Sequence, residues 1–291
     1  MRRYMKKSKL TYWMFLLPIL IPFFSALILP AIVGIGYSFT DWNGMKSTMD
    51  FIGFFNYIKL FSDSQFLYSL GFSVLVAITA VIIMNLLGFS FAFLVTRGFK
   101  GSNFLRGVFF MPNLIGGVLL GFTWQFIFTK VFAAIGKALG AEWLMGWLSN
   151  TTTGFWGLVI MLAWQSSGYV MLIYIAQLQS IPLELSEAAY IDGATKRQVL
   201  TRIILPLMRP AFTTSLFISL SFSLKIYDFN LALTNGNPQR TTEMIAMNIF
   251  KEAYSYNQMG YAQAKAVIFL LVIAAVTLTQ LRIFKKREIE L

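Results

Sequence analysis

Long, nearly uncharged runs of apolar residues alternate with short polar connections along the 291-residue chain. A helix needs roughly 20 apolar residues to cross the hydrocarbon part of a bilayer. Such runs cover about 11–38, 68–95, 104–129, 153–180, 210–234 and 260–284. They are too long and too uniformly apolar for barrel strands, and other folds leave backbone polar groups unpaired in lipid. The pattern therefore predicts an all-α protein with six membrane-spanning helices.

The first run follows a basic segment, as it would in a cleavable signal peptide. However, no charged residue occurs from Leu10 to Thr40, a length that exceeds a signal h-region and favours an uncleaved anchor. Pro18, Pro22 and Pro30 lie within this run and predict a kinked helix.

Basic residues gather in alternate connections, which predicts that these connections are cytoplasmic. Both termini then lie in the cytoplasm, giving a tail at 1–10, a single six-helix transmembrane domain at 11–284 and a second tail at 285–291. The basic residues concerned are Arg2, Arg3, Lys6, Lys7, Lys9, Arg97, Lys100, Arg106, Lys196, Arg197, Arg202, Arg209, Arg282, Lys285, Lys286 and Arg287.

Composition separates this chain from soluble proteins and from most enzymes. Hydrophobic residues make up 57% and charged residues 12%, whereas soluble domains are about one quarter charged. The net charge of +12 would suit nucleic acid, but the basic residues flank apolar runs, so no nucleic-acid partner is expected. The chain has no Cys and no His. It also lacks a nucleotide-binding P-loop, a nucleophile elbow and a metal-ligand cluster, so we expect neither a catalytic nor a metal site.

The connections expected on the outer side are 39–67, 130–152 and 235–259. Aromatic residues in the first suit the membrane interface. Ala133–Trp147 is amphipathic and predicts a short helix on the membrane surface. Chain reversal and docking of an external partner fit these segments equally well.

The loop at 181–209 has a different character. Pro182 ends the fourth span, and Glu184 and Glu187 follow in a short helix whose dipole favours early acidic residues. Gly193 permits a sharp reversal, after which an amphipathic segment leads to Pro206 and the fifth span. The loop therefore predicts a protruding helix–turn–helix with a small-residue face suited to a partner.

This loop resembles the EAA motif of permease subunits in binding-protein-dependent ABC importers. The motif has Glu-Ala-Ala, a Gly four residues later, nine residues, and then Ile-x-Leu-Pro. Here Glu187, Ala188, Ala189, Gly193, Ile203, Leu205 and Pro206 match in identity and spacing.

The resemblance extends over nearly the whole chain and narrows to carbohydrate importers of the maltose permease F and glycerol-phosphate permease A type. It rests on Phe51, Gly53, Asn56 and Tyr57, on Ile191-Asp192-Gly193-Ala194, and on Thr234-x-Gly236-Asn237-Pro238, where the family usually has Gly at the place of Asn237. In such importers two different permeases pair, and this chain is similar to the first.

The resemblance implies a bacterial plasma-membrane heteromer with a second permease, two cytoplasmic ATPases that hold ATP and Mg, and an extracytoplasmic sugar-binding protein. The chain itself would bind no cofactor. Its loop would couple to an ATPase and drive alternating access for a sugar, first of all an oligosaccharide; Glu187 would fix the loop by hydrogen bonds or an ion pair. The residues of this coupling loop are Glu184, Glu187, Ala188, Ala189, Asp192, Gly193, Leu205 and Pro206.

Polar and aromatic residues inside the spans are candidates for the substrate path, because they are costly in lipid. In a continuous fifth helix, Ser221, Lys225 and Asp228 would share a face, with Tyr227 and Asn230 on another. Lys225 and Asp228 could instead form a structural ion pair, with each other or with the partner permease. The third and fourth spans contribute Trp124, Gln125, Trp164, Gln165 and Tyr169, which also suit ordinary packing. Gly117-x-x-x-Gly121 permits close helix contact, which we assign to the permease pair.

Three alternatives stay open. A glycerol-3-phosphate importer has the same architecture, although no dense basic cluster lies in the spans. An ion-coupled secondary transporter would transport alone and would need internal repeats. A membrane enzyme would convert its substrate as a single chain.

Overall fold

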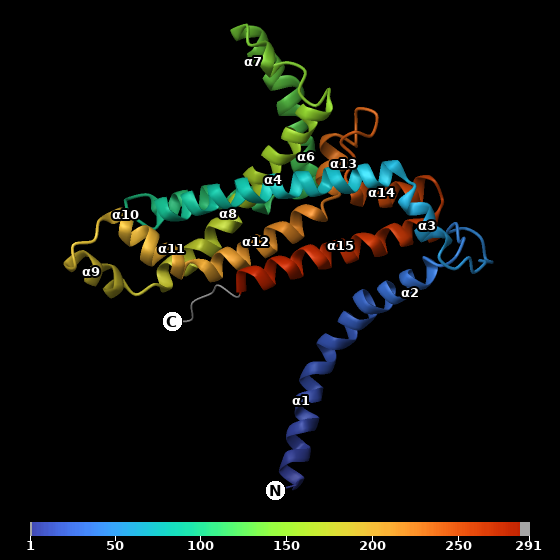
Figure 1. Ribbon diagram of the computed structural model, residues 1–291, viewed down its shortest axis with the longest axis horizontal. Coiled ribbons are helices and arrows are strands. Elements are labelled where there is room, and N and C mark those ends of the chain that lie inside the picture. The colour runs from blue at the N-terminus through green and yellow to red at the C-terminus, as the bar shows by residue number, and fades with distance from the viewer. Residues whose placement is uncertain (1, 286–291) are drawn as a thin grey trace. The chain divides into compact units, whose positions relative to one another are not determined.

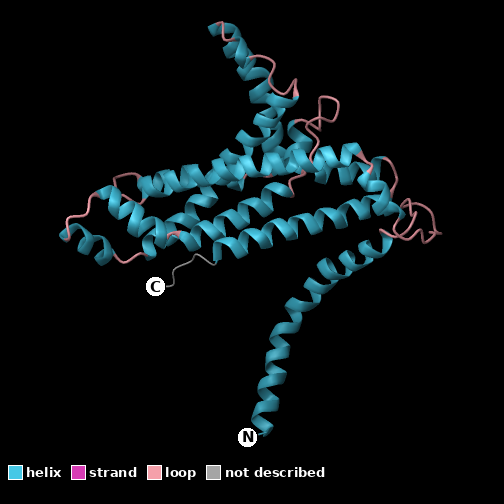
Figure 2. Ribbon diagram, in the orientation of Figure 1, coloured by secondary structure: helices cyan, strands magenta, loops and turns pink. Residues whose placement is uncertain are grey.

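The computed structural model describes the backbone of residues 2–285 and the side chains of residues 11–285 (Figures 1 and 2). The predicted tail at 285–291 therefore lies almost wholly outside the described residues, as do the side chains of the tail at 1–10. Two compact units are present: Met1–Ser64 with Ile249–Ile268, and Gln65–Asn248 with Phe269–Leu291.

The described residues are helical, apart from short connections and a single β-bridge between Thr40 and Phe51. Five helices are long and apolar enough to cross a membrane: Thr11–Tyr37, Ser64–Val95, Gly117–Leu139, Thr151–Ser180 and Met259–Lys285. A sixth span is reached if the bent pair Lys196–Leu207 and Arg209–Leu224 is counted as one. The predicted all-α membrane fold is confirmed.

The first unit begins with an irregular spanning helix made of α1 (Arg2–Phe23), η1 (Phe24–Ile28) and α2 (Leu29–Tyr37). The π-turn η1 follows Pro22 and precedes Pro30. Each proline lacks the N–H that would continue the helical ladder, so the irregularity appears where the prolines predict a kink. None of the most apolar part of this span is buried within the chain.

The connection that follows α2 in this unit is held by Asn56, at the start of α3 (Phe55–Phe61). Its side-chain amide donates hydrogen bonds of 2.9 Å to the carbonyls of Ser38 and Thr40. The same unit includes η6 (Lys251–Ser255) and the first part of α15 (Met259–Lys285).

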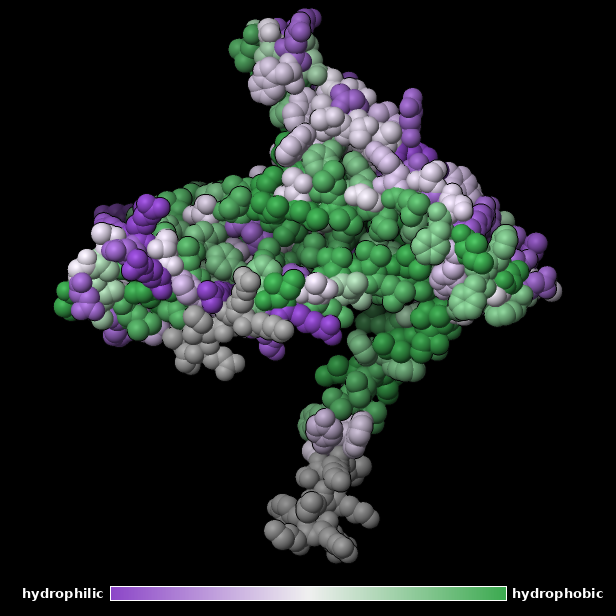
Figure 3. Space-filling model, in the orientation of Figure 1, coloured by the Kyte–Doolittle hydropathy of each residue, from purple (hydrophilic) through white to green (hydrophobic). Residues whose placement is uncertain are grey.

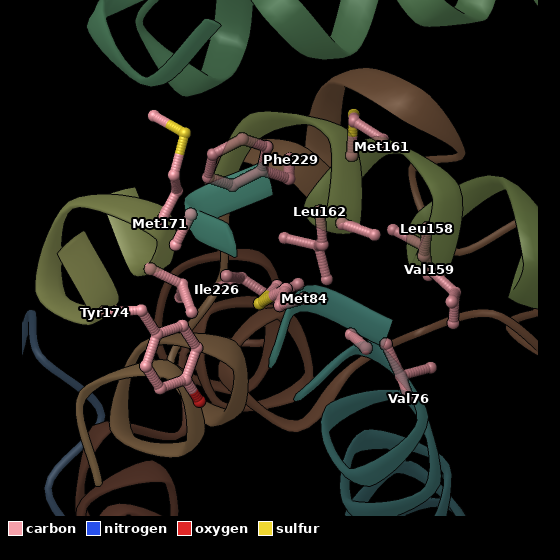
Figure 4. Close-up of a cluster of buried hydrophobic side chains, with 14 of the residues drawn as sticks. Val76, Met84, Leu158, Val159, Met161, Leu162, Met171, Tyr174, Ile226 and Phe229 are labelled. Atoms are coloured by element: carbon pink, nitrogen blue, oxygen red, sulfur yellow. The ribbon is translucent and has the colours of Figure 1, made fainter. Parts of the chain in front are cut away.

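The core of the second unit is built on α4 (Ser64–Val95) and α8 (Thr151–Ser180). Gly88 of α4 lies against Val170 of α8, where a β-carbon would come within 2.6 Å of the valine side chain. Val76, Met84, Leu158, Met171 and Tyr174 are among the buried side chains of the resulting cluster (Figure 4). Small and branched side chains thus let the two helices approach closely.

The third span differs from its prediction of one helix at 104–129. The chain forms α5 (Ser102–Phe110), the 3-10 turn η2 (Met111–Leu114) and then α6 (Gly117–Phe126), η3 (Ile127–Val131) and α7 (Phe132–Leu139). Pro112 cannot donate to the ladder, and Gly116 and Gly117 are weak helix formers, which explains the break.

The prediction of a separate surface helix at Ala133–Trp147 is wrong. Its first half continues the third span as α7, which ends at Gly140 in a left-handed conformation. Only the short turn η4 (Glu142–Leu144) follows, and Trp147 folds back to stack on Phe128 at 4.9 Å. Gly140 therefore stops the helix where the amphipathic pattern continues.

The fifth span is also broken, contrary to the continuous helix expected at 210–234. Helix α12 (Arg209–Leu224) ends before Lys225, and α13 (Asp228–Leu233) begins three residues later. Helix α13 is held by its packing on α6: a β-carbon at Gly121 would lie 2.5 Å from the β-carbon of Ala232. Tertiary contacts rather than a local breaker therefore decide this bend. The segment between α13 and η6 contains α14 (Ile245–Phe250).

Candidate functional site

The loop at 181–209 forms the predicted helix–turn–helix. Helix α9 (Leu183–Ile191) is followed by a turn at Gly193, whose φ is +81°, and by α10 (Lys196–Val199). Thr195 and Gln198 form a reciprocal capping box at the start of α10, with bonds of 2.7 and 3.3 Å. The chain then continues through η5 (Leu200–Ile204) and α11 (Leu205–Leu207), with Pro206 at the start of α11. A 60° bend separates this segment from α12.

Helix α9 has no buried residue. Apolar side chains are exposed on it, with 75% of Leu183 and 87% of Ile191 accessible. In Figure 3 polar residues gather at the end of the second unit where α9 and α10 lie, whereas apolar residues cover its helices. The helix thus offers a mixed apolar and acidic surface that nothing in the described chain covers.

Glu187 does not hold the loop together through contacts within the chain. Its side chain is exposed and has no ion pair or hydrogen bond to any residue that the structure describes. The bond expected for Glu187 therefore does not form within the described residues, and a bond to a partner stays a prediction.

A cavity of about 420 Å³ opens at the break between α12 and α13. It brings together Ser221, Lys225, Tyr227 and Asp228, all of which are predicted path residues. Tyr227 was expected on a different face, but the break turns it into the same cavity. Lys225 and Asp228 are both exposed, and no ion pair joins them within the described part of the chain. These two residues therefore do not pair with each other in this structure, and pairing with the partner permease stays a prediction.

A smaller cavity of about 180 Å³ adjoins it, since both are lined by Ile218 and Phe222. Its polar groups come from Tyr169, Ser219, Asn113 and Ser166. Tyr169 is a predicted path residue. Asn113 and Ser166 were missed, because short polar residues are common in helices and turns and carry no periodic signal.

Trp124 and Trp164 lie together, with ring centroids 5.6 Å apart in an edge-to-face arrangement. They line a third cavity of about 490 Å³ whose other lining residues are apolar except for Ser167. Lys225 does not line this cavity, so the structure does not bring the tryptophans and Lys225 into one site.

Gln125, Gln165 and Asn230 have structural hydrogen bonds. Gln125 donates to the carbonyl of Leu233 at 3.2 Å, and Gln165 to that of Ile115 at 3.1 Å. Asn230 is fully buried; its amide donates to Thr242 O at 2.8 Å and its side-chain oxygen accepts from Met244 N at 2.9 Å. Asn230 therefore organises the loop that follows α13 and does not line the cavities beside α12.

A buried polar network joins three helices of the second unit and was also missed. The hydroxyl of Tyr174 on α8 donates to Asn85 Oδ1 on α4 at 2.6 Å, and Ser215 Oγ on α12 donates to the same oxygen at 2.7 Å. Asn85 in turn donates to Ser219 at 3.3 Å. Ser219 also lines the smaller cavity, so the network fixes the helices that form its wall.

Gly117 and Gly121 were predicted to pack against a second permease. In the structure they pack against another helix of the same chain. Their missing side chains admit Asp228, Phe229 and Ala232 of α13. Metal-binding clusters of His, Cys, Asp or Glu are absent among the described residues.

Comparison with known proteins agrees with the loop motif. Residues 84–289 match the family described as binding-protein-dependent transport system inner membrane component. Over 285 residues the chain is 48% identical to the probable starch degradation products transport system permease protein AmyD of Thermoanaerobacterium thermosulfurigenes, covering 98% of this chain and 97% of that protein. Over 278 residues it is 31% identical to the multiple sugar-binding transport system permease protein MsmF of Streptococcus mutans, covering 95% and 96%.

A solved structure has the same fold. The crystal structure of a bacterial ABC transporter involved in the import of the acidic polysaccharide alginate contains a chain that matches with a TM-score of 0.82 and 22% identity, over 98% of each chain. Since the family match covers most of the sequence and these relatives align from end to end, the chain belongs to the inner membrane components of binding-protein-dependent transport systems.

Proposed function

We propose that this chain is one of two permeases in an ATP-driven importer for oligosaccharides. The observation that carries the proposal is its 48% identity, along almost its entire length, to a permease named for the transport of starch degradation products. MsmF and the trehalose/maltose permease MalF of Thermococcus litoralis, which is 28% identical, are also named for sugars.

The cavities beside α12 are the proposed substrate path in this chain. Hydroxyl and amide groups of Ser166, Tyr169, Ser221 and Asn113 would bond sugar hydroxyls, while Phe222 offers an apolar face. Lys225 and Asp228 carry opposite charges at the break, which suits a neutral polar cargo better than a dianionic phosphate. This balance favours an oligosaccharide over glycerol-3-phosphate.

Helix α9 is the proposed docking element for a cytoplasmic ATPase. Exposed Leu183 and Ile191 would enter an apolar groove, and Ala188 would allow close approach. ATP and Mg would be bound by two ATPase subunits, so this chain would need no cofactor. The sense of insertion follows, with α9 and both termini in the cytoplasm of a bacterial cell.

The second permease is proposed to cover part of the first span. Residues Thr11–Tyr37 form an apolar helix of 27 residues with none of its most apolar part buried in this chain. Lipid would also cover such a helix, but a two-permease importer needs an extended apolar interface. An extracytoplasmic sugar-binding protein would deliver the cargo on the opposite side from α9.

Transport by the reconstituted complex tests the proposal. ATP-dependent uptake of a labelled maltooligosaccharide should require this chain, the second permease, the ATPase and the binding protein together. Uptake by this chain alone, driven by an ion gradient, would establish a secondary transporter instead. Preferential uptake of glycerol-3-phosphate would overturn the sugar assignment and retain the architecture.

The chain contains no cysteine, so single-cysteine variants can locate α9. Ala188→Cys should form a crosslink with an ATPase cysteine placed in its transmembrane-domain groove. Thr151→Cys, at the start of α8, serves as the matched control and should not react with the ATPase. A crosslink from Thr151→Cys alone would reverse the proposed orientation.

A further inference from the structure

One apolar cavity of the second unit has no role in the proposed sugar path. This cavity of about 490 Å³ lies between α4, α5, η2, α6 and α8. Its lining includes Leu87, Phe91, Val108, Phe109, Trp124 and Trp164. An engineered apolar cavity of about 150 Å³ takes up benzene, so this space is large enough for a segment of a hydrocarbon chain.

The side chains that line this cavity offer too few hydrogen-bonding groups to bind a sugar. Each sugar hydroxyl that leaves water needs a new hydrogen-bond partner, and an unpaired one costs about 1–3 kcal/mol. Ser167 supplies the hydroxyl of this cavity, while the other side chains are aliphatic, aromatic, proline or methionine. A flexible apolar ligand matches such a surface.

A cationic group adjoins the apolar space. Arg106 lies on α5 three residues before Phe109, and residues three apart in a helix share a face. Phe109 is fixed in the cavity wall by stacking on Phe91, with ring centroids 4.2 Å apart and planes 7° apart. Arg106 is therefore about one helical turn from the cavity.

The guanidinium of Arg106 has unused hydrogen-bonding capacity. Its Nε atom is buried and lacks a hydrogen-bond partner among the residues that the structure describes. A buried donor of this kind is costly unless it is paired. Planar guanidinium groups bind phosphate through parallel hydrogen bonds.

The surrounding connection favours an anion. Arg97 and Lys100 precede Arg106, and the sequence from Thr96 to Arg106 contains no acidic residue. The backbone of α5 is held against α8, because Gly168 leaves room for the carbonyl of Phe109. The backbone that carries Arg106 is thus fixed relative to the cavity.

We propose that the cavity holds one acyl chain of an anionic phospholipid whose phosphate is bound by Arg106. The lipid comes from the leaflet next to the 96–106 connection. It fills the space between α4, α5 and α8, and its phosphate pairs with the accessible part of the Arg106 guanidinium. The bound chain lies against Trp124 and Trp164, which therefore report on its presence.

Quenching of tryptophan fluorescence by brominated acyl chains tests this site in the assembled transporter in nanodiscs. The probes are phosphatidylglycerol and phosphatidylcholine brominated on their chains. The signal from the cavity is the difference between the unmodified protein and the Trp124→Phe/Trp164→Phe variant. We expect half-maximal quenching of this signal at a several-fold lower fraction of brominated phosphatidylglycerol than of brominated phosphatidylcholine.

Two substitutions separate the headgroup from the chain. Arg106→Gln should abolish the preference for phosphatidylglycerol, whereas Lys100→Gln, at an exposed position in the same connection, should retain it. Val108→Phe should fill the cavity and remove most of the quenching by both lipids. Val118→Phe, on an exposed surface of α6 outside the cavity, should leave quenching unchanged.

An unchanged lipid preference in Arg106→Gln would overturn the headgroup assignment. Full quenching in Val108→Phe would overturn the chain site. If Arg106→Gln fails to assemble, Arg106→Lys replaces it: we expect a reduced preference for phosphatidylglycerol, since ammonium keeps the charge but loses the paired geometry. A preference equal to that of the unmodified protein would then contradict the proposal.

Discussion

Lys265 Nζ lies 2.6 Å from Glu252 Oε2 in the first unit and 2.8 Å from Asp63 Oδ2. The lysine is only 1% exposed. Tyr261 donates a hydrogen bond of 3.0 Å to the same Asp63 oxygen. One buried cation therefore joins α15, the π-turn η6 and the residue before α4, which ties these segments together.

Removal of the cation should be much more damaging than removal of one carboxylate. Lys265→Met leaves Asp63 and Glu252 close together without their shared cation, and loss of one partner of a buried pair costs about 3–5 kcal/mol. Glu252→Gln should cost less, because Asp63 still pairs with Lys265. Thermal unfolding of the purified protein in detergent measures both.

The control for this cluster is Lys59, which is exposed and lies 4.1 Å from the centre of the Tyr261 ring. Lys59→Met should lower the unfolding temperature little, since exposed cation–π contacts contribute about 0.5–1 kcal/mol. Equal losses for Lys59→Met and Lys265→Met would show that burial of the cation is not what matters.

Gly121 provides a steric prediction. A β-carbon there would meet Ala232 at 2.5 Å, so Gly121→Val should separate α13 from α6 and move the wall of the cavity at Lys225. Overpacking of this kind costs about 1–3 kcal/mol. Gly107→Ala on α5, where a β-carbon would have no neighbour within 4 Å, is the matched control and should leave stability and transport intact. Normal uptake by Gly121→Val would argue against this packing.

The sequence predicted the helices and their family motif better than it predicted the site. Apolar runs and clustered basic residues are properties of whole segments, so the spans could be located from composition alone. Breaks inside spans depend on tertiary contacts. No proline or glycine near Lys225 indicates that the helix ends there, whereas the packing of Ala232 against Gly121 positions α13. The same contacts turn Tyr227 into the cavity, so a continuous helical pattern assigned Tyr227 to the wrong face. They also bury Asn230, which the pattern could not show.

The polar network of α4, α8 and α12 should behave as one unit. Tyr174→Phe and Ser215→Ala each remove a donor to Asn85. Hydrogen bonds inside membrane proteins contribute about 0.6 kcal/mol on average and up to about 1.7. The double variant should lose less stability than the sum of the single variants, because the first change already leaves Asn85 partly unpaired. Strict additivity in unfolding measurements would show that the three residues are not coupled.

Lys225 and Asp228 provide a prediction about the cargo. Lys225→Met and Asp228→Asn change opposite charges in the same cavity while approximately preserving side-chain size. If the cargo is a neutral oligosaccharide, both should weaken transport by similar factors through loss of hydrogen bonds. If it is glycerol-3-phosphate, Lys225→Met should abolish uptake and Asp228→Asn should increase it. Initial uptake rates over a range of substrate concentrations distinguish the two patterns.

Gly193 separates backbone conformation from side-chain contact in the proposed coupling loop. Its φ of +81° is unfavourable for residues with a side chain, yet a β-carbon there would meet no atom within 4 Å. Gly193→Val should therefore act through backbone strain of about 1–3 kcal/mol that turns α9 away from its position. Gly193→Asn should be tolerated, because asparagine adopts left-handed conformations more readily. We expect ATP hydrolysis to persist in the Gly193→Val complex while substrate uptake falls, and Gly193→Asn to retain both. Equal loss of uptake in the two variants would indicate that a partner leaves no room for any side chain at this position. The turn geometry alone would then not explain the requirement for glycine.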